Sequence, residues 1–447
     1  MIRGMSVAAD SASLPVVLSF EEARHLVEQH ASQLSSGQPE TLDLLAASGR
    51  ILAQEVLADR DFPPFNRATR DGYAVRAADL AALPARLEVI GEIKAGDWPD
   101  PASSSVRPGE AIAIMTGAPL PAEADAVVMV EHTAFVNSPV NSALAGMPAN
   151  TLSNTSSKTV EMRRSVSAGE NFVPRGAEAR VGQILLGRGR RLDHAAIAIA
   201  ASTGNHRVQV FRKPRVAVLS TGDEVVEIAT VPGPAQIRNS NSYSLAAQIQ
   251  EAGGEAVRLA IAPDEPVRLR ALIEEGLQCD LLLLTGGVSM GKYDLVEQVL
   301  TELAAEFYFT GAEIQPGRPV VFGSCAAPAQ HKTYFFGLPG NPVSTMVTFE
   351  LFARPMLEGL AGMPPQPLVF LRAQLKSEIK TKTGLKRFLP AILSGEFENA
   401  EVELARWQGS GDIAALARTN CYVVIPPDRE RIEAGEWVPL LLARNRN

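Results

Sequence analysis

Cysteine, aromatic residues and long apolar runs are all scarce in this chain of 447 residues. Its three cysteines, Cys279, Cys325 and Cys421, stand far apart and form no Cys-x-x-Cys pair. This spacing favours buried thiols in a reducing compartment over a disulfide scaffold or a zinc site. No apolar run approaches the ~20 residues of a membrane helix, and the first residues lack the apolar segment of a secretory signal. We therefore expect a cytoplasmic protein with no membrane partner.

The chain also has no excess of positively charged residues. The chain has 42 Lys and Arg residues against 50 Asp and Glu residues, which gives a formal net charge of −8. Nucleic acids and anionic membranes bind surfaces rich in Lys and Arg, so this balance argues against a nucleic-acid partner. It also means that a substrate carrying phosphate must meet local cations in its binding site.

What the chain does have is the composition of a folded protein, with 46% hydrophobic and 21% charged residues. Its length predicts roughly two to four domains. Residues 1–15 are expected to form a flexible tail. Residues 137–158 are rich in small and polar side chains, and we expect a mobile surface insertion there because such a segment buries little apolar surface.

Strand-like and helix-like segments alternate in the middle of the chain. Compact apolar runs at residues 216–219, 256–261 and 281–284 are separated and followed by helical patterns at 242–252, 266–277 and 294–304. This alternation predicts a doubly wound parallel sheet with helices on both faces, over about residues 191–362. After Pro364 the helical patterns disappear and short β-like runs suggest a small β domain. Near the N-terminus, Ser19 and Glu22 form a candidate capping box for a helix that ends near Gln33.

Three glycine-bearing loops are expected at strand ends of the predicted sheet, at residues 220–224, 285–291 and 337–342. In open parallel sheets, ligands bind outside the carboxyl ends of the strands. Glycines let backbone amides approach an anion closely. In the third loop, Asn341 can cap the next helix and Pro342 suits its first turn, which would direct free amides toward an oxyanion. Each loop alone could be a plain connector, but the three together favour a binding crevice.

Acidic residues stand beside these loops. Asp223 and Glu224 end the first loop, and Asp294 closely follows the second. Asp264 starts a predicted helix, and Asp71 lies in an earlier loop. Clustered carboxylates can hold Mg²⁺ and bridge it to substrate phosphates. The alternative is that Asp264 and Asp294 are helix N-caps, and for Asp264 taken alone this is the preferred interpretation.

Several motifs together resemble the molybdopterin molybdenumtransferase family, to which the E domain of gephyrin also belongs. The resemblance covers nearly the whole chain in the family's order and extends to Gln408-Gly409-Ser410 and Asn420-Cys421. The motifs are Asp71-Gly72-Tyr73-Ala74, Met115-Thr116-Gly117-Ala118-Pro119, Ser220-Thr221-Gly222-Asp223-Glu224, Gly286-Gly287-Val288-Ser289-Met290-Gly291 with Asp294, and Gly337-Leu338-Pro339-Gly340-Asn341-Pro342.

The resemblance implies an α/β multidomain protein that forms a homodimer. Its doubly wound molybdopterin-binding domain would span residues 191–365, and a small β-barrel domain residues 366–447. A discontinuous linker domain would comprise residues 16–65 and 160–190, and a β-rich domain residues 66–159. The implied activity is Mg²⁺-dependent insertion of molybdenum from molybdate into adenylylated molybdopterin, with release of AMP. A molybdopterin adenylyltransferase and recipient molybdoenzymes are the implied protein partners.

The resemblance also implies roles for individual residues. Asp71, Thr116 and Glu224 match the family's catalytic residues, and Asp223, Asp264 and Asp294 match the acidic positions of the Mg²⁺ region. Pro339, Pro342, Ser344 and Ser410 match a pocket where the third and fourth domains meet. The full implied substrate-binding set is Ser220, Thr221, Gly222, Gly286, Gly287, Ser289, Gly291, Arg318, Pro339, Gly340, Asn341, Pro342, Ser344 and Ser410.

The sequence departs from the family at basic positions. Gln315 stands where the family usually has a lysine, and Pro390 where it tends to have an arginine. Arg318 keeps one cation in the first of these loops, and its guanidinium suits a tetrahedral oxyanion. Lys386 and Arg387 either substitute for the missing arginine or form a solvated basic patch.

Two other functions compete with the enzyme. The missing cations suggest a paralogue that binds molybdopterin or finished cofactor without catalysis. A generic phosphate-binding α/β enzyme is the third alternative, but it explains neither the motif at Asp71 nor the one at Ser410.

Overall fold

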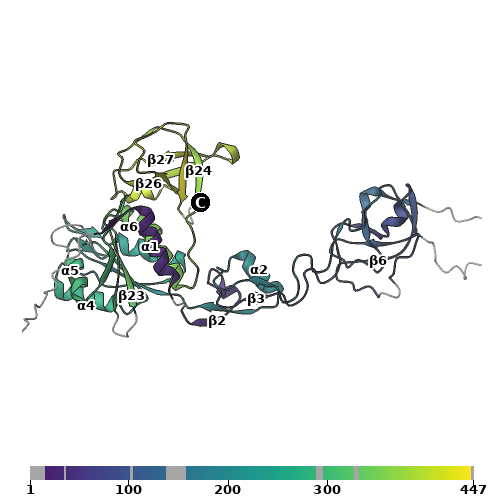
Figure 1. Cartoon of the computed structure of the whole chain (residues 1–447), viewed down its shortest axis with the longest axis horizontal. Coiled ribbons are helices and arrows are strands. Elements are labelled where there is room, and N and C mark those ends of the chain that lie inside the picture. Colours follow the sequence, from purple (N-terminus) through teal and green to yellow (C-terminus); the bar gives the residue numbers. More distant parts are fainter. Residues whose placement is uncertain are drawn as a thin grey trace, which may run out of the picture. The chain divides into compact units, whose positions relative to one another are not determined.

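The computed structural model describes residues 16–34, 37–100, 104–136, 158–287, 295–326 and 332–443. The chain folds as two compact units. The larger unit comprises Met1–Gln54, Arg188–Asp193 and Arg207–Asn447, and the smaller unit comprises Glu55–Gly187 and His194–His206 (Figure 1). The flexible tail predicted at residues 1–15 lies outside the described residues, as do residues 137–157 of the predicted insertion; Lys158 begins a strand.

A six-stranded sheet forms the centre of the larger unit. Its order is β17 (Glu255–Arg258), β14 (Arg215–Ser220), β18 (Leu281–Thr285), β23 (Lys332–Leu338), β22 (Val321–Ala326) and β19 (Glu306–Phe309). The first four strands are parallel, as predicted, but β22 and β19 run antiparallel to their neighbours. The expectation of a wholly parallel sheet is therefore wrong at this edge. Only residues 327–331 join β22 to β23, and a parallel crossover needs about a dozen residues or more.

Helices cover both faces of this sheet because successive side chains of a strand point to opposite sides. Val216 and Val218 pack with α3 (Ser240–Ala252), α6 (Pro342–Thr348), α7 (Arg354–Leu360) and α1 (Phe20–Ser32). Ala217 and Leu219 pack with α4 (Pro266–Gly276) and α5 (Leu295–Glu302). A π-helical segment, Phe349–Ala353, joins α6 to α7. In Figure 1, α1 and α6 lie on one side of β23, and α4 and α5 on the other. The predicted doubly wound arrangement is confirmed.

The N-terminal helix α1 begins at the predicted capping box. Ser19 Oγ accepts a hydrogen bond from the Glu22 amide at 3.3 Å, and the Glu22 carboxylate accepts one from the Ser19 amide at 2.9 Å. The family resemblance implied a place for this helix in the linker domain. It packs instead in the core beside α7, because Phe20, Ala23 and Val27 form one buried stripe. The preceding strand β1 (Val17–Leu18) pairs with β20 (Gly311–Ala312) of the same unit.

The C-terminal part of the larger unit is a closed barrel of five strands. They are β26 (Lys386–Ser394), β27 (Glu401–Leu404), β24 (Phe370–Leu375), β30 (Trp437–Leu442) and β28 (Cys421–Ile425), and a β26–β28 pairing closes the ring. Val402, Val423 and Leu440 are fully buried inside it. One short helix, α8 (Ile413–Leu416), departs from the expected absence of helices after Pro364. The strand β21 (Ile314–Gln315) of the preceding segment pairs with β26, and β25 (Ile379–Lys380) pairs with β29 (Arg431–Ile432).

Residues 191–214 do not join the central sheet, although the sequence analysis placed them in its domain. The strand β13 (Arg207–Phe211) forms an antiparallel ribbon with β2 (Pro39–Asp43), and α2 (His194–Ser202) belongs to the smaller unit. A short parallel pair, β15 (Val225–Val226) and β16 (Ile237–Arg238), follows the end of β14.

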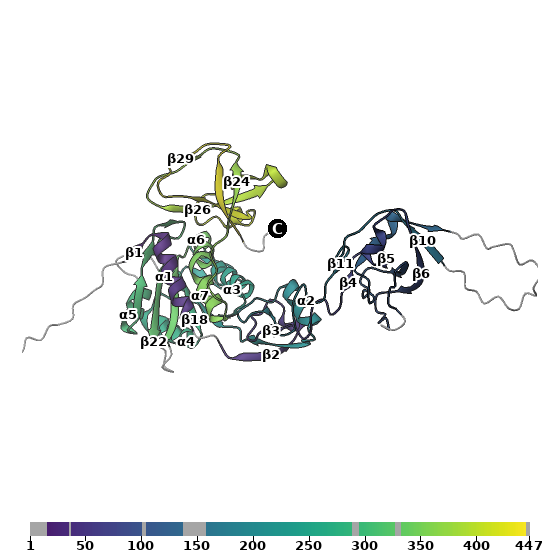
Figure 2. The same ribbon diagram turned by 45° about the vertical axis from the view of Figure 1, so that its right-hand side comes forward.

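The smaller unit contains a second six-stranded sheet, whose strands β5, β6 and β10 are labelled in Figure 2. The order is β8 (Ala126–Met129), β5 (Gly72–Val75), β7 (Glu110–Ile114), β6 (Ala85–Ile93), β10 (Lys158–Met162) and β9 (Thr133–Val136). Two ribbons, β4 (Arg67–Ala68) with β11 (Phe172–Val173) and β3 (Val56–Leu57) with β12 (Ile184–Leu186), complete the strands of this unit. Tyr73, Val128 and Met162 are buried in its core.

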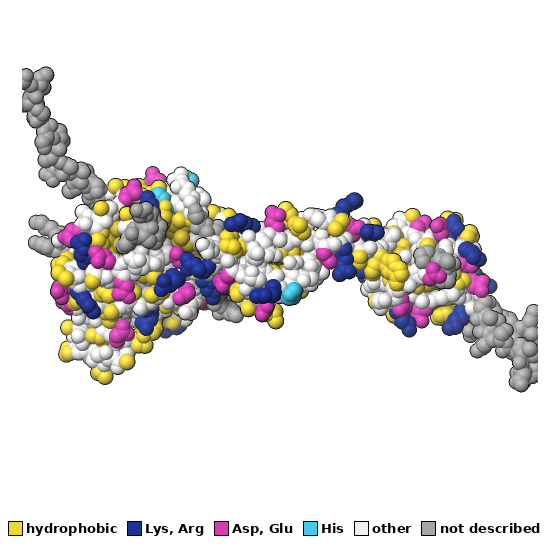
Figure 3. Space-filling view, turned by 90° about the horizontal axis from the view of Figure 1, so that it is seen from below, with side chains coloured by type: hydrophobic (Ala, Val, Ile, Leu, Met, Phe, Trp, Pro, Cys, Tyr) yellow, Lys and Arg dark blue, Asp and Glu magenta, His cyan; other side chains and the backbone are white. Residues whose placement is uncertain are grey.

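The charged surface residues and the cysteine thiols are arranged as the composition of the chain led us to expect. Lys and Arg side chains are interspersed with Asp and Glu on the face that Figure 3 shows. Cys279, Cys325 and Cys421 are all buried free thiols. In the described part of the chain, no helix is both long enough and apolar enough to cross a membrane.

Candidate functional site

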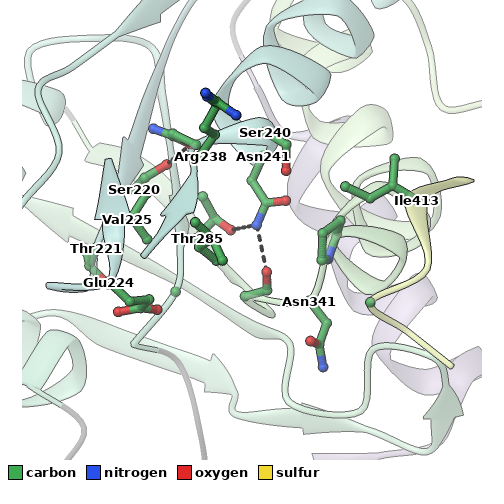
Figure 4. A pocket seen from close by; sticks show the side chains of 16 residues that line it. Ser220, Thr221, Glu224, Val225, Arg238, Ser240, Asn241, Thr285, Asn341 and Ile413 are labelled. Atoms are coloured by element: carbon green, nitrogen blue, oxygen red, sulfur yellow. Dashed lines mark hydrogen bonds between the residues drawn. The ribbon is translucent and has the colours of Figure 1, made fainter. Parts of the chain in front are cut away.

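The three predicted loops meet at one edge of the central sheet. β14, β18 and β23 are parallel neighbours, so their carboxyl ends lie together. A cavity of about 710 Å³ opens at this edge (Figure 4). The predicted site residues that line it are Ser220, Thr221, Glu224, Gly286, Gly340, Asn341 and Pro342.

Glycines permit the close approach of these loops. Gly286 has a φ of +90°, and a Cβ at this position would lie 2.4 Å from the Thr221 carbonyl oxygen. A Cβ on Gly340 would lie 3.5 Å from the Gly286 Cα. The loops after β14, β18 and β23 therefore touch through backbone atoms, and a side chain at Gly286 would separate the first two.

The start of α3 supplies residues that the sequence analysis missed. Asn239 Oδ1 accepts hydrogen bonds from the Ser242 amide at 3.1 Å and from Ser220 Oγ at 3.0 Å. Asn241 Nδ2 donates to Thr285 Oγ1 at 2.9 Å and to the Gly340 carbonyl at 2.7 Å. Both asparagines line the cavity, together with Arg238 and Ser240. The run of polar residues between a strand and a helix was the signal that could have indicated them.

The start of α6 differs from its prediction. Asn341 occupies the N-cap position and Pro342 the first turn, but the Asn341 side chain makes no capping hydrogen bond. The Val343 amide donates instead to the Ser410 carbonyl at 3.0 Å, from the loop before α8. The expected capping by the Asn341 side chain is wrong, and one amide expected to face an anion is already bonded to the chain. Gly411 and Ile413, which follow Ser410, also line the cavity.

Three acidic side chains gather beside this cavity. Asp223 Oδ1 accepts a hydrogen bond from the Asp264 amide at 3.1 Å. Partial desolvation, and then the negative charges of Asp223 and Glu224, raise the pKa of the Asp264 carboxyl. Glu265, not Asp264, takes the N-cap position of α4, so the capping interpretation of Asp264 is wrong. No three His, Cys, Asp or Glu side chains within the described residues are arranged to hold one metal ion. Ser289, Gly291 and Asp294 lie outside those residues.

Asp71 and Thr116 meet in the smaller unit. They flank paired strands, because Gly72 of β5 lies opposite Ile114 of β7. Asp71 Oδ1 accepts hydrogen bonds from the Thr116 amide at 2.6 Å and from Thr116 Oγ1 at 2.8 Å. These two bonds hold the pKa of the exposed Asp71 carboxyl below its usual value. A Cβ on Gly72 would lie 1.9 Å from the Val128 carbonyl, so only glycine fits beside this pair. Glu224, the third predicted catalytic residue, belongs to the larger unit.

Other predicted residues lie behind or away from the cavity. The Pro339 carbonyl accepts hydrogen bonds from Thr285 Oγ1 at 3.4 Å and Thr345 Oγ1 at 2.5 Å, and Ser344 is only 4% exposed. Gly222 and Gly287 occupy the same loops as Thr221 and Gly286 without lining the cavity, and neither Arg318 nor Asp223 lines it. Arg318 is exposed, and its carbonyl accepts from the Ala312 amide at 3.0 Å.

The basic residues near Gln315 do not form a solvated patch. Gln315 pairs with Arg387 across β21 and β26 and is itself exposed. Arg387 is 6% exposed and donates from Nη1 to the Leu385 carbonyl at 3.0 Å. Lys386 forms an ion pair with Glu21, and its Nζ lies 4.7 Å from the centre of the Phe20 ring. The solvated interpretation of Lys386 and Arg387 is therefore wrong.

Comparison with known proteins covers the whole fold. The MoeA N-terminal region (domains I and II) matches residues 18–204, a probable molybdopterin-binding domain matches residues 217–359, and the MoeA C-terminal region (domain IV) matches residues 372–443. A crystal structure of a molybdopterin biosynthesis MoeA protein from Pyrococcus horikoshii is similar with a TM-score of 0.73 and 27% identity, covering 96% of this chain and all of that one.

Curated relatives are similar to this chain over almost their full length. A molybdopterin molybdenumtransferase from Nostoc sp. is 33% identical over 434 residues, which are 95% of this chain and 93% of that protein. One from Bacillus subtilis is 30% identical over 416 residues, which are 92% of this chain and 91% of that protein. Together with the three matched regions, these similarities show that the chain is an enzyme of molybdenum cofactor biosynthesis that belongs to the molybdopterin molybdenumtransferase family.

Proposed function

We propose that this enzyme inserts molybdenum from molybdate into adenylylated molybdopterin in an Mg²⁺-dependent reaction that releases AMP. The observation that carries the proposal is the cavity where the loops after β14, β18 and β23 meet. Its volume of about 710 Å³ falls within the range typical of small-molecule sites. Its position, outside the carboxyl ends of parallel strands, is where such sheets bind their ligands.

The cavity suits a large, mostly uncharged ring system with a charged end. Glu224 and Arg238 are the charged side chains among its lining residues, and Thr221, Asn239 and Asn241 represent the neutral polar majority. Neutral polar groups orient a heterocycle through hydrogen bonds, whereas phosphate requires cations or backbone amides. Arg238 is the lining cation that would meet the phosphates, and Arg318 is the proposed cation for molybdate in the neighbouring loop.

Asp223 and Asp264 would hold Mg²⁺, with Asp294 as a third donor. Their oxygen donors fit this ion, and partial burial together with the negative charges of Asp223 and Glu224 raises the pKa of the Asp264 carboxyl. A bound Mg²⁺ would offset negative charge on the phosphoanhydride. Mg²⁺ in such sites takes one or two carboxylates plus substrate phosphates, so a closed set of three protein ligands is not required.

Asp71, Thr116 and Glu224 are the proposed catalytic residues. The Thr116 bonds orient Asp71 and lower the pKa of its carboxyl, so we propose that it acts as a hydrogen-bond acceptor or as a weak general base. Substrate positioning would follow from the loops that carry Pro339, Pro342, Ser344 and Ser410. We also expect a homodimer, and a monomer mass independent of concentration in light scattering would contradict that expectation.

A reconstitution assay tests the proposal. Purified protein is mixed with adenylylated molybdopterin, Mg²⁺ and molybdate, and AMP release and cofactor yield are measured. We expect both products, in equal amounts, and neither when Mg²⁺ is chelated. The exposed, uncharged Gln315 favours a second candidate, a cofactor-binding paralogue. Tight binding of adenylylated molybdopterin without AMP release at any molybdate concentration would establish that candidate.

A further inference from the structure

The segment between β15 and β16, residues 227–236, forms a loop beside the cavity, which we call the rim loop. Every residue of the rim loop except Pro232 is exposed. At its base, the Ile237 amide donates to the Glu224 carbonyl at 2.8 Å. The residues that flank the loop and also line the cavity are Glu224, Val225, Ile237 and Arg238. The rim loop therefore projects from the wall of the cavity.

Arg238 ties the rim loop to the start of α3. Its Nε donates to the Ile228 carbonyl at 3.0 Å and to the Thr230 carbonyl at 3.2 Å. Within the described residues, neither Nη of Arg238 makes a hydrogen bond or an ion pair. Figure 4 shows the guanidinium at the outer end of the labelled side chains, away from Thr285. The loop carbonyls thus hold one edge of the guanidinium, while the N–H donors of both Nη atoms stay available to a ligand.

The charge around Arg238 favours an anion. Arg238 and Glu224 are the charged side chains among the lining residues, and they form no ion pair with each other in the described structure. The Glu224 carboxylate lies against Gly222 instead, where a Cβ would come within 2.4 Å of Glu224 Oε2. The helix α3 begins two residues after Arg238, so the positive end of its dipole adds to the guanidinium charge. The planar Nη fork matches two oxygens of a tetrahedral oxyanion.

We propose that Arg238 binds a tetrahedral oxyanion at the rim of the cavity and that the rim loop positions its guanidinium for this contact. This rests on the proposed function, which supplies two such groups, the phosphates of adenylylated molybdopterin and free molybdate. The Nη atoms would hold the oxyanion while Nε stays on the carbonyls of Ile228 and Thr230. Binding of the oxyanion would therefore also restrain the rim loop.

The first test is Arg238→Gln, with Arg258→Gln as its matched control. Arg258 is exposed, lies over the Tyr243 ring with Cζ 3.9 Å from the ring centre, and does not line the cavity. Each variant removes one positive charge from the larger unit. Calorimetric affinity for AMP should fall about tenfold in Arg238→Gln and stay unchanged in Arg258→Gln. Adenosine, which lacks the phosphate, should bind all three proteins equally.

The second test is Arg238→Lys, which keeps the charge but removes the Nε donor and the planar fork. Hydrogen exchange is followed at two rim-loop amides, those of Thr230, which donates to the Glu227 carbonyl at 2.9 Å, and Gln236, which donates to the Gly233 carbonyl at 3.1 Å. AMP should slow exchange at both amides in the wild type but not in Arg238→Lys. Equal slowing in the two proteins would overturn the positioning role of the rim loop.

Titration with molybdate distinguishes the two oxyanions. A loss of molybdate affinity in Arg238→Gln, without a loss of AMP affinity, would support the oxyanion site and assign it to molybdate. Unchanged affinity for both probes would overturn the inference, and turnover by the wild type would then leave the proposed function intact. Binding of AMP that depends on Arg238, without turnover by the wild type, would support the inference and refute the proposed function. A wild type that binds neither probe would overturn the inference whatever its turnover.

Discussion

In the larger unit the cavity forms where three neighbouring parallel strands end, whereas in the smaller unit Asp71 and Thr116 meet at the paired ends of two antiparallel strands. The first arrangement joins residues from distant parts of the chain, from Ser220 to Pro342. The second joins β5 to β7 of one sheet. A parallel sheet collects loops at one edge, which makes a cavity, while an antiparallel pair places two side chains directly opposite each other.

The two sites also differ in the hydrogen bonds that their polar side chains make within the protein. Asp71 Oδ1 accepts two hydrogen bonds from Thr116, which orient this exposed carboxylate within the smaller unit. Thr221 and Asn241 are lining residues of their cavity, and Thr221 Oγ1 and Asn241 Oδ1 are buried without a hydrogen-bond partner. The proposed function assigns substrate binding to the larger unit and a preorganised carboxylate to the smaller unit. The predictions below test that division, beginning with the largest expected effect.

Asp71→Asn should lower turnover by about 100-fold or more while leaving the affinity for adenylylated molybdopterin unchanged, because a removed general base affects the reaction step. Steady-state AMP release and calorimetric binding measure the two effects. Asp97→Asn is the control, since Asp97 is also an exposed aspartate that accepts from a backbone amide, that of Lys94 at 2.9 Å. A loss of substrate affinity in Asp71→Asn would break the proposed division between binding and catalysis.

Two glycine variants should each disturb the packing of one unit only. Gly72→Ala would bring a Cβ to within 1.9 Å of the Val128 carbonyl, and Gly286→Ala would bring one to within 2.4 Å of the Thr221 carbonyl. Overpacking of this kind costs about 1–3 kcal/mol. Gly286→Ala should abolish binding of the substrate, whereas Gly72→Ala should destabilise the smaller unit and leave binding intact.

Thermal unfolding and calorimetry compare these glycine variants with Gly91→Ala, a position in the smaller unit where a Cβ meets no atom within 4 Å. Equal effects of Gly72→Ala and Gly286→Ala on substrate binding would show that the cavity depends on both units.

The features that could be predicted from the sequence are those that depend on local residue patterns or on the alternation of strands and helices. The capping box at Ser19, the helices on both sheet faces and the meeting of the loops at Thr221, Gly286 and Gly340 follow from residue spacing and topology. Such features depend on near neighbours in the chain, or on the rule that parallel strands share their carboxyl ends.

The remaining features depend on long-range contacts that no local pattern encodes. The Asn341 cap was predicted from residue type, but the Val343 amide is bonded by Ser410 from a distant segment. Asn241 was missed because its place at the cavity depends on contacts with Thr285 and Gly340, which lie far away in the sequence. The packing of α1 beside α7 likewise joins two helices that lie far apart in the sequence.

Arg318→Ala should weaken the use of molybdate and leave molybdopterin binding intact, because Arg318 does not line the cavity. Restoring a cation by Gln315→Lys at the exposed end of β21 should tighten the apparent molybdate affinity about fivefold, roughly 1 kcal/mol for one charge-assisted contact. The measurement is AMP release and cofactor yield against molybdate concentration for the wild type and both variants. An unchanged molybdate dependence in Arg318→Ala would assign the cation elsewhere, with the buried Arg387 as the first candidate.

The smallest expected effect is a pH dependence confined to the stability of the larger unit. His30 of α1 stacks on Tyr308 with ring centres 4.2 Å apart and lies 3.3 Å from the Tyr334 hydroxyl. Burial, and then the positive charge of Lys332, lower the pKa of His30 from its usual value of 6.5. Below that value the unfolded chain therefore binds more protons than the folded one, and stability falls as the pH drops from 6.5 toward the folded-state pKa.

His30→Gln should flatten this slope in thermal unfolding between pH 7.5 and 5.5, whereas His25→Gln, at an exposed position of the same helix, should retain it. His30 packs against Tyr308 and Tyr334, which belong to the central sheet of the larger unit. Only the unfolding transition of the larger unit should therefore move with pH. If the transition of the smaller unit moved by the same amount, the two units would unfold together, and the glycine variants could no longer be assigned to one unit each.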